Sequence, residues 1–166
     1  MSKVLVIDVE KCTGCRLCEA VCSTVNEGVS NPARSRVKVV RFEWDGLQVP
    51  TVCQQCEDAA CVAVCPVKAL TRDEALGCVR VNYELCIGCR VCMMACPFGA
   101  MSFDPVNNRV IKCELCDGDP ACVRFCEPEA IQYVDTSMAD MAKRRQLGAS
   151  IFRAIGKAEE EFLGVR

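Results

Sequence analysis

Sixteen of the 17 cysteines fall into four groups of four, and this repeat constrains the fold more than any other feature of the chain. Every group opens with two cysteines separated by two residues and closes with two cysteines separated by three. The gap in the middle is two residues in the first and third groups, four in the second and five in the fourth. The groups are Cys12, Cys15, Cys18 and Cys22; Cys53, Cys56, Cys61 and Cys65; Cys86, Cys89, Cys92 and Cys96; and Cys113, Cys116, Cys122 and Cys126.

The spacing within the groups suits cubane [4Fe–4S] clusters. The third group, CIGCRVCMMACP, fits the C-x2-C-x2-C-x3-C-P run of bacterial ferredoxins. Two-residue gaps let the backbone wrap three neighbouring corners of a cubane, and Gly14 and Gly88 are free to take a positive φ there. The closing three-residue gap corresponds to one helical turn, which aims the fourth cysteine away from its own loop. We therefore expect four [4Fe–4S] clusters, with these sixteen cysteines as the iron ligands.

Zinc sites and disulfides are the alternatives for so many cysteines. All-cysteine zinc sites use two C-x2-C pairs that are usually well separated in sequence, unlike four compact runs. A closed disulfide framework fits poorly with an odd number of cysteines. The remaining cysteine, Cys78, precedes a short strand-like run, and we interpret it as a small buried apolar residue rather than as a ligand.

The residues after the closing cysteine also repeat in three of the groups. Ala69, Ala100 and Ala130 each lie four residues past that cysteine, and a larger apolar residue follows. The first group has Asn26 at this position, so we expect the chain to leave this group by a different path. The proline that follows the second and third groups is replaced by Ser23 in the first group and by a glutamate in the fourth.

Short strands and short helices are expected between the groups. The Asp45-Gly46 pair favours a tight type I′ turn between two extended segments. Extended segments are predicted at residues 3–8, 37–44, 47–50, 79–82, 101–104 and 109–112, and short helices are predicted to begin near Leu17, Cys61, Val91 and Ala121.

The segment from Met138 to Leu163 differs from the rest because it lacks cysteine and proline, and its apolar residues recur at nearly helical spacing. We predict a helical arm over residues 136–166. It could pack back on its own domain, bind a partner or another copy of the chain, or lie on a membrane surface. We favour a partner-binding or self-association arm, because a small body filled with clusters offers little apolar surface to cover so long a segment.

Charge and composition exclude several classes of function. The formal net charge is −2 with cysteines counted as neutral. Four clusters would bring it to about −10, since each ligated cubane adds about −2. Nucleic-acid binding needs a basic face and is not expected. The chain has no histidine, which excludes His-ligated haem, Rieske centres and His-based acid–base catalysis. We find no signal peptide pattern and no apolar run near the roughly 18 residues of a membrane span, so we expect a cytoplasmic location.

The four groups, their order and their gaps resemble the four-cluster ferredoxin-like subunits of molybdenum and tungsten oxidoreductase complexes. This family includes the iron–sulfur subunits of formate dehydrogenases, dimethyl sulfoxide reductase and formate hydrogenlyase. It also includes the small subunit of bacterial aldehyde:ferredoxin oxidoreductases, which this short chain resembles most. The resemblance covers about residues 3–135 and implies an α+β fold of two interleaved bicluster modules. The outer module would comprise residues 1–50 and 105–135, and the inner module residues 51–104, with the arm at 136–166.

The resemblance also implies how the groups share their ligands. In that family the first and fourth groups exchange their closing cysteines, and so do the second and third groups. The resulting ligand sets are Cys12, Cys15, Cys18 and Cys126; Cys113, Cys116, Cys122 and Cys22; Cys53, Cys56, Cys61 and Cys96; and Cys86, Cys89, Cys92 and Cys65.

The implied function is electron transfer within an oxidoreductase complex. The chain would relay single electrons between a catalytic tungsten or molybdenum pterin subunit, expected to oxidise aldehydes, and another redox partner such as a flavin subunit or a ferredoxin. It would not be an enzyme on its own, because the sequence shows no Rossmann or Walker glycine pattern and no acid–base constellation. The alternatives are a free-standing polyferredoxin and a redox sensor or cluster-transfer scaffold.

Charged residues near the cysteines predict differences in potential between the clusters. Negative charge disfavours the addition of an electron, so we expect the cluster at Cys113 to be among the lowest in potential, unless the charges around it are simply solvated. The acidic residues that flank this group are Glu114, Asp117, Asp119 and Glu127. The basic residues expected to act oppositely at their own clusters are Lys11, Arg16 and Arg90.

Overall fold

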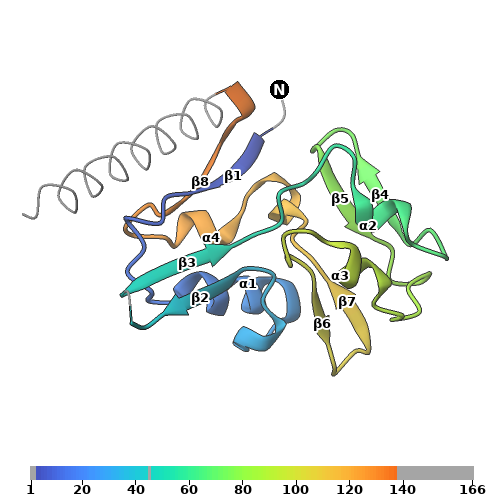
Figure 1. The fold of residues 1–166 in the computed structure, drawn as a ribbon, viewed down its shortest axis with the longest axis horizontal. Helices are drawn as coiled ribbons and strands as arrows, with labels where there is room; N and C mark the ends of the chain where they lie inside the picture. Colours follow the sequence, from blue (N-terminus) through green and yellow to red (C-terminus); the bar gives the residue numbers. More distant parts are fainter. Residues whose placement is uncertain (1–2, 45, 138–166) are drawn as a thin grey trace, which may run out of the picture.

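The fold is built from pairs of short antiparallel strands with short helices between them (Figure 1). The computed structural model describes residues 3–44 and 46–137. In this part of the chain the strands form four two-stranded sheets, which pair β1 with β8, β2 with β3, β4 with β5, and β6 with β7. The mixture of short strands and short helices agrees with the α+β class predicted from the sequence.

The first and last strands of the described chain pair with each other. Strand β1 (Lys3–Ile7) runs antiparallel to β8 (Ile131–Asp135), with Lys3 opposite Asp135 and Ile7 opposite Ile131. Figure 1 shows the two strands side by side, with the rest of the fold to one side of them. The extended segment predicted at residues 3–8 is confirmed, whereas β8 was not predicted.

The hairpin predicted around Asp45-Gly46 is present, but its turn is longer than expected. Strand β2 (Lys38–Phe42) pairs with β3 (Leu47–Thr51), and the last pair joins Phe42 to Leu47. Four positions therefore separate the strands, where a type I′ turn would have two. The N–H of Gly46 donates to the carbonyl of Glu43 at 3.4 Å, and this hydrogen bond closes the turn just before β3 begins.

Two further hairpins lie in the middle of the sequence. Strand β4 (Leu70–Asp73) pairs with β5 (Cys78–Val81), and β6 (Ser102–Asp104) pairs with β7 (Arg109–Ile111). Three of these strands coincide with predicted extended segments to within one or two residues. The exception is β4, whose sequence LTRD is mostly polar and lacks an extended apolar pattern.

In each cysteine group an α-helix carries the third cysteine and begins at or close to the predicted position. The α-helices are α1 (Leu17–Glu27), α2 (Ala60–Ala63), α3 (Val91–Ala95) and α4 (Ala121–Arg124), and the 3-10 helices are η1 (Pro32–Arg34) and η2 (Leu115–Gly118). Helix α1 has 11 residues, and the others have four or five. The expected difference after the first group is confirmed: Asn26 donates its side-chain N–H to the carbonyl of Cys22 at 2.7 Å, and α1 continues to Glu27, with Gly28 as its C-cap.

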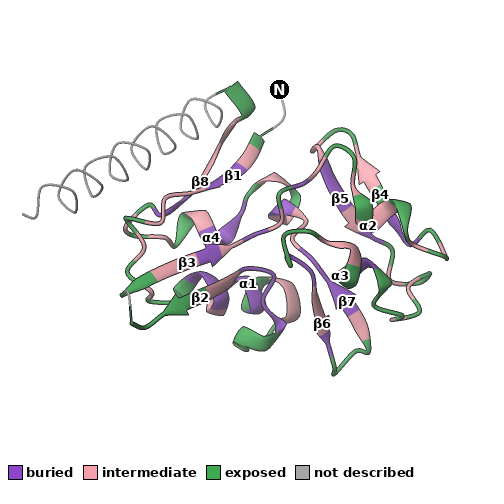
Figure 2. Ribbon diagram, viewed as in Figure 1, coloured by how far each residue is buried: buried purple, intermediate pink, exposed green. Residues whose placement is uncertain are grey.

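Two small apolar cores support these elements. The first core gathers Leu5, Val37, Leu115 and Ile131, and Cys78 lies within it with no exposed surface. This burial confirms the interpretation of Cys78 as a core residue. The second core contains Leu70, Val79, Val81, Met101 and Val110, together with Cys92. Because Val110 belongs to β7, the second core extends past residue 104. Figure 2 shows the buried positions concentrated on β5 and β7 in this region.

A buried network of ion pairs joins the end of α1 to the β6–β7 hairpin. The carboxylate of Glu27 is bound by Arg34 and Arg36, each at 2.7 Å, and by Arg109 at 3.1 Å. Arg34 also binds Asp104 at 2.8 Å. The side chains of Glu27 and Asp104 are almost fully buried, so this network connects segments about 70–80 residues apart in sequence.

All but the first two residues of the helical arm predicted at 136–166 lie outside the described residues. Within residues 3–44 and 46–137, no helix has the length and apolar character needed to cross a bilayer.

Candidate functional site

Twelve of the sixteen grouped cysteines line three cavities that combine different groups. One cavity, the Cys12 cavity, is lined by Cys12, Cys15, Cys18 and Cys126. A second, the Cys113 cavity, is lined by Cys22, Cys113, Cys116 and Cys122. A third, the Cys53 cavity, is lined by Cys53, Cys56, Cys61 and Cys96. Each cavity therefore takes three cysteines from one group and the closing cysteine of another. Their volumes are similar, about 320, 360 and 390 Å³ with the open space at their mouths.

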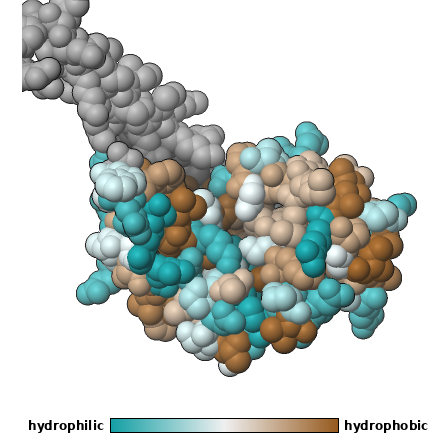
Figure 3. Space-filling view, turned by 60° about the horizontal axis from the view of Figure 1, so that its bottom comes forward, coloured by the Kyte–Doolittle hydropathy of each residue, from teal (hydrophilic) through white to brown (hydrophobic). Residues whose placement is uncertain are grey.

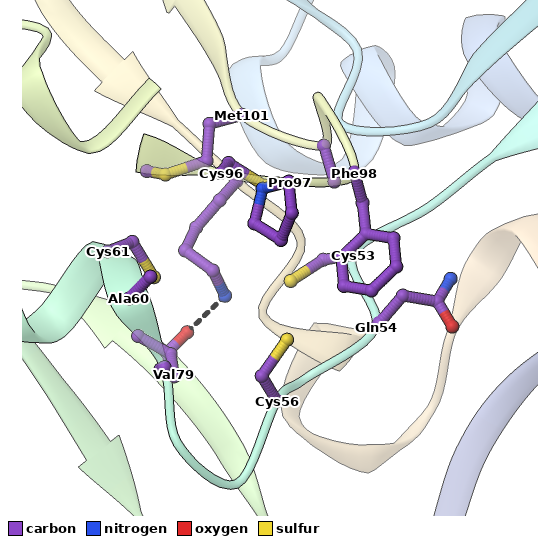
Figure 4. Close-up of a pocket in the computed structure, with 13 residues that line it drawn as sticks. Cys53, Gln54, Cys56, Ala60, Cys61, Val79, Cys96, Pro97, Phe98 and Met101 are labelled. Carbon is purple, nitrogen blue, oxygen red and sulfur yellow. Dashed lines mark hydrogen bonds between the residues drawn. The ribbon is translucent and has the colours of Figure 1, made fainter. Parts of the chain in front are cut away.

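The Cys53 cavity illustrates how the cysteines are presented. Figure 4 shows the sulfur atoms of Cys53, Cys56 and Cys61 turned towards the space between them, with Pro97 and Phe98 along the upper side. The cysteines of the opening pair lie on a loop, while Cys61 lies on α2. The closing cysteine of the third group ends α3, where the chain turns towards the cavity.

Three of the other four cysteines belong to the second core or pack against it. Cys92 is buried, Cys65 and Cys86 pack against the second core, and Cys89 is exposed. The N–H of Ala69 donates to the sulfur of Cys65 at 3.2 Å. No three side chains of cysteine, aspartate or glutamate in the described part of the chain are grouped closely enough to hold a single metal ion.

All four opening loops share one backbone feature. The residue before the second cysteine has a positive φ in each group: 70° at Gly14, 49° at Gln55, 67° at Gly88 and 59° at Leu115. The two glycines were predicted, and the other two residues were not. Gln55 is held by its side chain, which donates to the carbonyl of Cys113 at 2.9 Å, and Leu115 is fully buried in the first core. These contacts offset the strain that a side chain meets in the left-handed region.

The segments after the closing cysteines share a second feature. Lys68, Gly99 and Glu129 lie three residues past the closing cysteine and have φ values of 52°, 58° and 54°. Each donates its N–H to the carbonyl of that cysteine, at 2.9–3.2 Å. The alanine and the larger apolar residue that follow are buried in all three cases, which confirms the register predicted from the sequence.

Comparison with known proteins identifies the cofactor that the cysteines bind. The family model described as "4Fe-4S dicluster domain" matches residues 44–136, and "4Fe-4S binding domain" matches residues 5–24. The chain belongs to the 4Fe-4S dicluster family. It therefore binds several [4Fe–4S] clusters and transfers electrons through them, as a ferredoxin-like subunit associated with oxidoreductases.

Individual relatives extend over most of the chain. The chain is 43% identical over 122 residues to the polyferredoxin-like subunit of aliphatic sulfonate oxidoreductase from Pyrococcus furiosus, covering 74% of this chain and 70% of the relative. It is 34% identical over 184 aligned positions to formate hydrogenlyase subunit 2 from Escherichia coli K12, covering 88% and 89% of the two chains. One solved structure that aligns with it is the active site complex BamBC of benzoyl coenzyme A reductase as isolated, with a TM-score of 0.49, 25% identity and coverage of 95% and 96%.

The chemistry of the cavities fits a [4Fe–4S] cluster. Burial raises the pKa of Cys18 and of Cys113 to about 12 and the pKa of Cys92 to about 11. Thiolates at these positions therefore need a strongly cationic partner, and an iron–sulfur core provides one. Backbone N–H groups also face the sulfurs, as where Arg36 donates to Cys22 at 3.3 Å. Such hydrogen bonds stabilise thiolate ligands and influence the cluster potential.

The three cysteine cavities and the cysteines around Cys92 follow one another in a row. Burial raises the pKa of Cys122 most, and negative charge on Cys18 of the Cys12 cavity adds to the rise. Cys53 acts in the same way on Cys113, from the neighbouring Cys53 cavity. In the same way, Cys61 of the Cys53 cavity adds to the raised pKa of Cys92.

The chain also connects these sites. Helix α1 carries both Cys18 of the Cys12 cavity and Cys22 of the Cys113 cavity, and Lys112 of the Cys53 cavity directly precedes Cys113. Helix α3 carries Cys92 and has Cys96 of the Cys53 cavity as its C-cap, so the sites are neighbours in that order.

Two of the four acidic residues near the fourth group are paired with arginines. Arg80 binds Asp117 at 2.6 Å, and Arg124 binds Asp119 at 2.9 Å. Both carboxylates are well exposed, so solvent and arginine together reduce their influence on a cluster at Cys113. Among the basic residues, Arg16 is paired with Glu19. These pairs weaken the basis for predicting a low potential at Cys113 from acidic residues alone.

Replacing Gly88 with alanine is expected to weaken the loop of the third group. A Cβ atom at Gly88, where φ is +67°, would lie 2.6 Å from the backbone oxygen of Asn108. The left-handed conformation alone costs a side chain about 1–2 kcal/mol, and a backbone oxygen cannot move aside cheaply. Gly99→Ala is the matched control, because Gly99 has φ +58° and open space around its Cβ position. The measurement is the rate of cluster loss under an anaerobic chelator challenge; equal rates in the two variants would contradict the argument.

Proposed function

We propose that this chain relays single electrons through four [4Fe–4S] clusters as the non-catalytic subunit of an oxidoreductase complex. Its partners would be a tungsten or molybdenum pterin subunit that oxidises aldehydes and a second redox partner, a flavin subunit or a ferredoxin. The observation that carries the proposal is the row of cysteine cavities. Because each cavity lies next to the following one, the row forms a route for successive one-electron steps. A reducing compartment such as the cytoplasm suits sixteen ligand cysteines.

The cavities support the ligand sets that the family resemblance implies. Each of three sets lines one cavity: the sets containing Cys12 and Cys126, Cys113 and Cys22, and Cys53 and Cys96. The fourth set, Cys86, Cys89, Cys92 and Cys65, would hold the last cluster. We propose two interleaved modules on this basis, an outer one closed by the β1–β8 pair and an inner one around the second core.

The two ends of the row are the places where electrons would enter and leave. Cys15 of the Cys12 cavity and Cys89 of the fourth set are the exposed cysteines among those described. Exposed apolar residues lie close to Cys89 in the sequence, with Ile87 63% and Met94 88% exposed. On the face drawn in Figure 3, apolar areas alternate with polar ones. An exposed ligand beside apolar side chains suits the close approach of a redox partner.

The residues of the chain prepare the route in three ways. Each opening loop contains a left-handed residue, and the closing cysteines connect the first group with the fourth and the second with the third. Apolar side chains such as Leu115 and Val37 exclude water from the inner part of the row. When bound, the clusters supply one-electron chemistry, and the protein adjusts their potentials through hydrogen bonds, charge and solvent exposure.

The proposal is tested on the complex, purified anaerobically from its own host through a tag on this chain. We expect a co-purifying pterin subunit with tungsten or molybdenum, and we expect an aldehyde to produce the electron paramagnetic resonance (EPR) signals of reduced [4Fe–4S] clusters. Clusters that stay oxidised with aldehyde but become reduced with another substrate would reject the aldehyde assignment. A lone chain that keeps its activity without residues 138–166 would instead support a free-standing polyferredoxin.

A further inference from the structure

Lys112 is the largest fully buried side chain of the described residues, and it lies where the two cores meet. It follows β7 and immediately precedes Cys113. Its Nζ donates to the carbonyl of Val79 at 2.5 Å, to the carbonyl of Cys113 at 2.7 Å and to Oε1 of Gln55 at 3.3 Å. The dashed line in Figure 4 marks the bond to Val79 at the edge of the Cys53 cavity. Three acceptors match the three N–H donors of a charged ammonium group.

None of these three acceptors carries a negative charge. Among residues 3–44 and 46–137, no carboxylate lies within ion-pair distance of Lys112, whereas the buried Arg34 and Arg36 both bind Glu27. A buried charge without an opposite charge is strongly unfavourable. The structure therefore calls for a negative group near Lys112 other than aspartate or glutamate.

The cysteine cavities on both sides of Lys112 provide that negative charge. Lys112 lines the Cys53 cavity, and the next residue, Cys113, lines the Cys113 cavity. Burial raises the pKa of Cys61 in the first of these cavities, and the charge of Lys112 opposes the rise; it opposes the rise at Cys113 as well. A cubane with four thiolate ligands carries about −2, so two such groups would surround the ammonium.

We propose that Lys112 is a shared counter-charge for the clusters of the Cys53 and Cys113 cavities and raises the potentials of both. It is a tuning residue, because it contacts the backbone around the clusters and acts through its charge. An electron that passes between the two cores moves between these two cavities. The same fixed charge on Lys112 therefore stabilises the electron in either cavity. The inference rests on the proposed placement of the clusters. It also opposes the effect expected from the acidic residues near Cys113. Of these, Asp117 and Asp119 are exposed and paired with arginines, whereas Lys112 is buried.

The test is a redox titration of the purified complex, followed by EPR, with Lys112→Gln compared with the unmodified chain. Glutamine keeps an N–H donor for the surrounding carbonyls but removes the charge. We expect two of the four clusters to become at least tenfold harder to reduce at a given potential, which is about 59 mV for a one-electron step. The spectra lost in Cys96→Ala and Cys22→Ala chains identify these two clusters. The matched control is Lys68→Gln, which removes an exposed lysine close to Cys65 and should shift no cluster comparably.

Unchanged potentials in Lys112→Gln with all clusters present would overturn the inference and leave the proposed function intact. Equal shifts of all four clusters would overturn it too, because a shared local charge acts on two. Lys112→Met provides a second neutral side chain of similar length and should reproduce the shift. If both variants fail to assemble clusters, Lys112 is a structural residue and the tuning role is rejected. If the Cys96→Ala and Cys22→Ala variants keep the full set of cluster spectra, the proposed placement of the clusters fails instead.

Discussion

Replacing Glu27 with glutamine is expected to destabilise the folded chain by about 3–5 kcal/mol. Removal of one partner from a buried ion pair has an effect of this size because the remaining charge is left buried without compensation. Glu27 binds three arginines at once, and among the carboxylates of residues 3–44 and 46–137 a second partner, Asp104, is found for Arg34 alone. The substitution keeps the shape of the side chain, so the loss reports on charge. The measurement is anaerobic urea unfolding, with the free energy taken from the midpoint and the slope.

The matched control for this prediction is Glu74→Gln. Glu74 also pairs with an arginine, Arg72, but at 3.7 Å and with 83% of its side chain exposed. Exposed pairs contribute about 0–1 kcal/mol, so this variant should unfold almost like the unmodified chain. Similar losses in the two variants would show that burial does not decide the strength of the Glu27 network.

Replacing Cys126 with alanine is expected to remove one complete cluster and to leave the other three. Cys126 closes the fourth group but lines the cavity of the first group, with Cys12, Cys15 and Cys18. Iron content should fall from about 16 to about 12 atoms per chain, since one cubane holds four irons. The EPR component that disappears should be the same one that disappears in Cys12→Ala.

The spectra of Cys113→Ala and Cys78→Ala complete this experiment. Cys113→Ala should remove a different component, although Cys113 belongs to the same group as Cys126 in the sequence. Cys78→Ala should keep all the iron, because Cys78 lies in the first apolar core. Loss of one common component in Cys126→Ala and Cys113→Ala would mean that each group holds its own cluster, contrary to the proposed ligand sets.

Local patterns in the sequence predicted much of the fold. The cysteine spacing located the four loops, and the helix starts at Leu17 and Ala121 follow from it. Gly14 and Gly88 could be recognised because glycine tolerates a positive φ. Strand β4 was missed because its residues are mostly polar, and β8 because its partner β1 lies more than 120 residues away in sequence.

The residues that escaped prediction depend on contacts between distant segments. Gln55 adopts a left-handed conformation because its side chain is anchored to Cys113 and Val79. Nothing in the sequence distinguishes Lys112 from an ordinary surface lysine. It is buried because it lies where the two cores pack together. In the same way, nothing near Glu27 in sequence indicates that Arg109 will bind it. Periodicity and spacing describe neighbours along the chain, and these three features arise between elements.

The most direct test of the central claim is anaerobic native mass spectrometry of the full chain, tagged and purified from its own host. The account predicts a polypeptide of 18.2 kDa carrying the added mass of four [4Fe–4S] clusters, within a larger complex that also contains the catalytic subunit. A chain that carries zinc, or that carries fewer than four clusters when freshly isolated, would contradict the four-cluster relay.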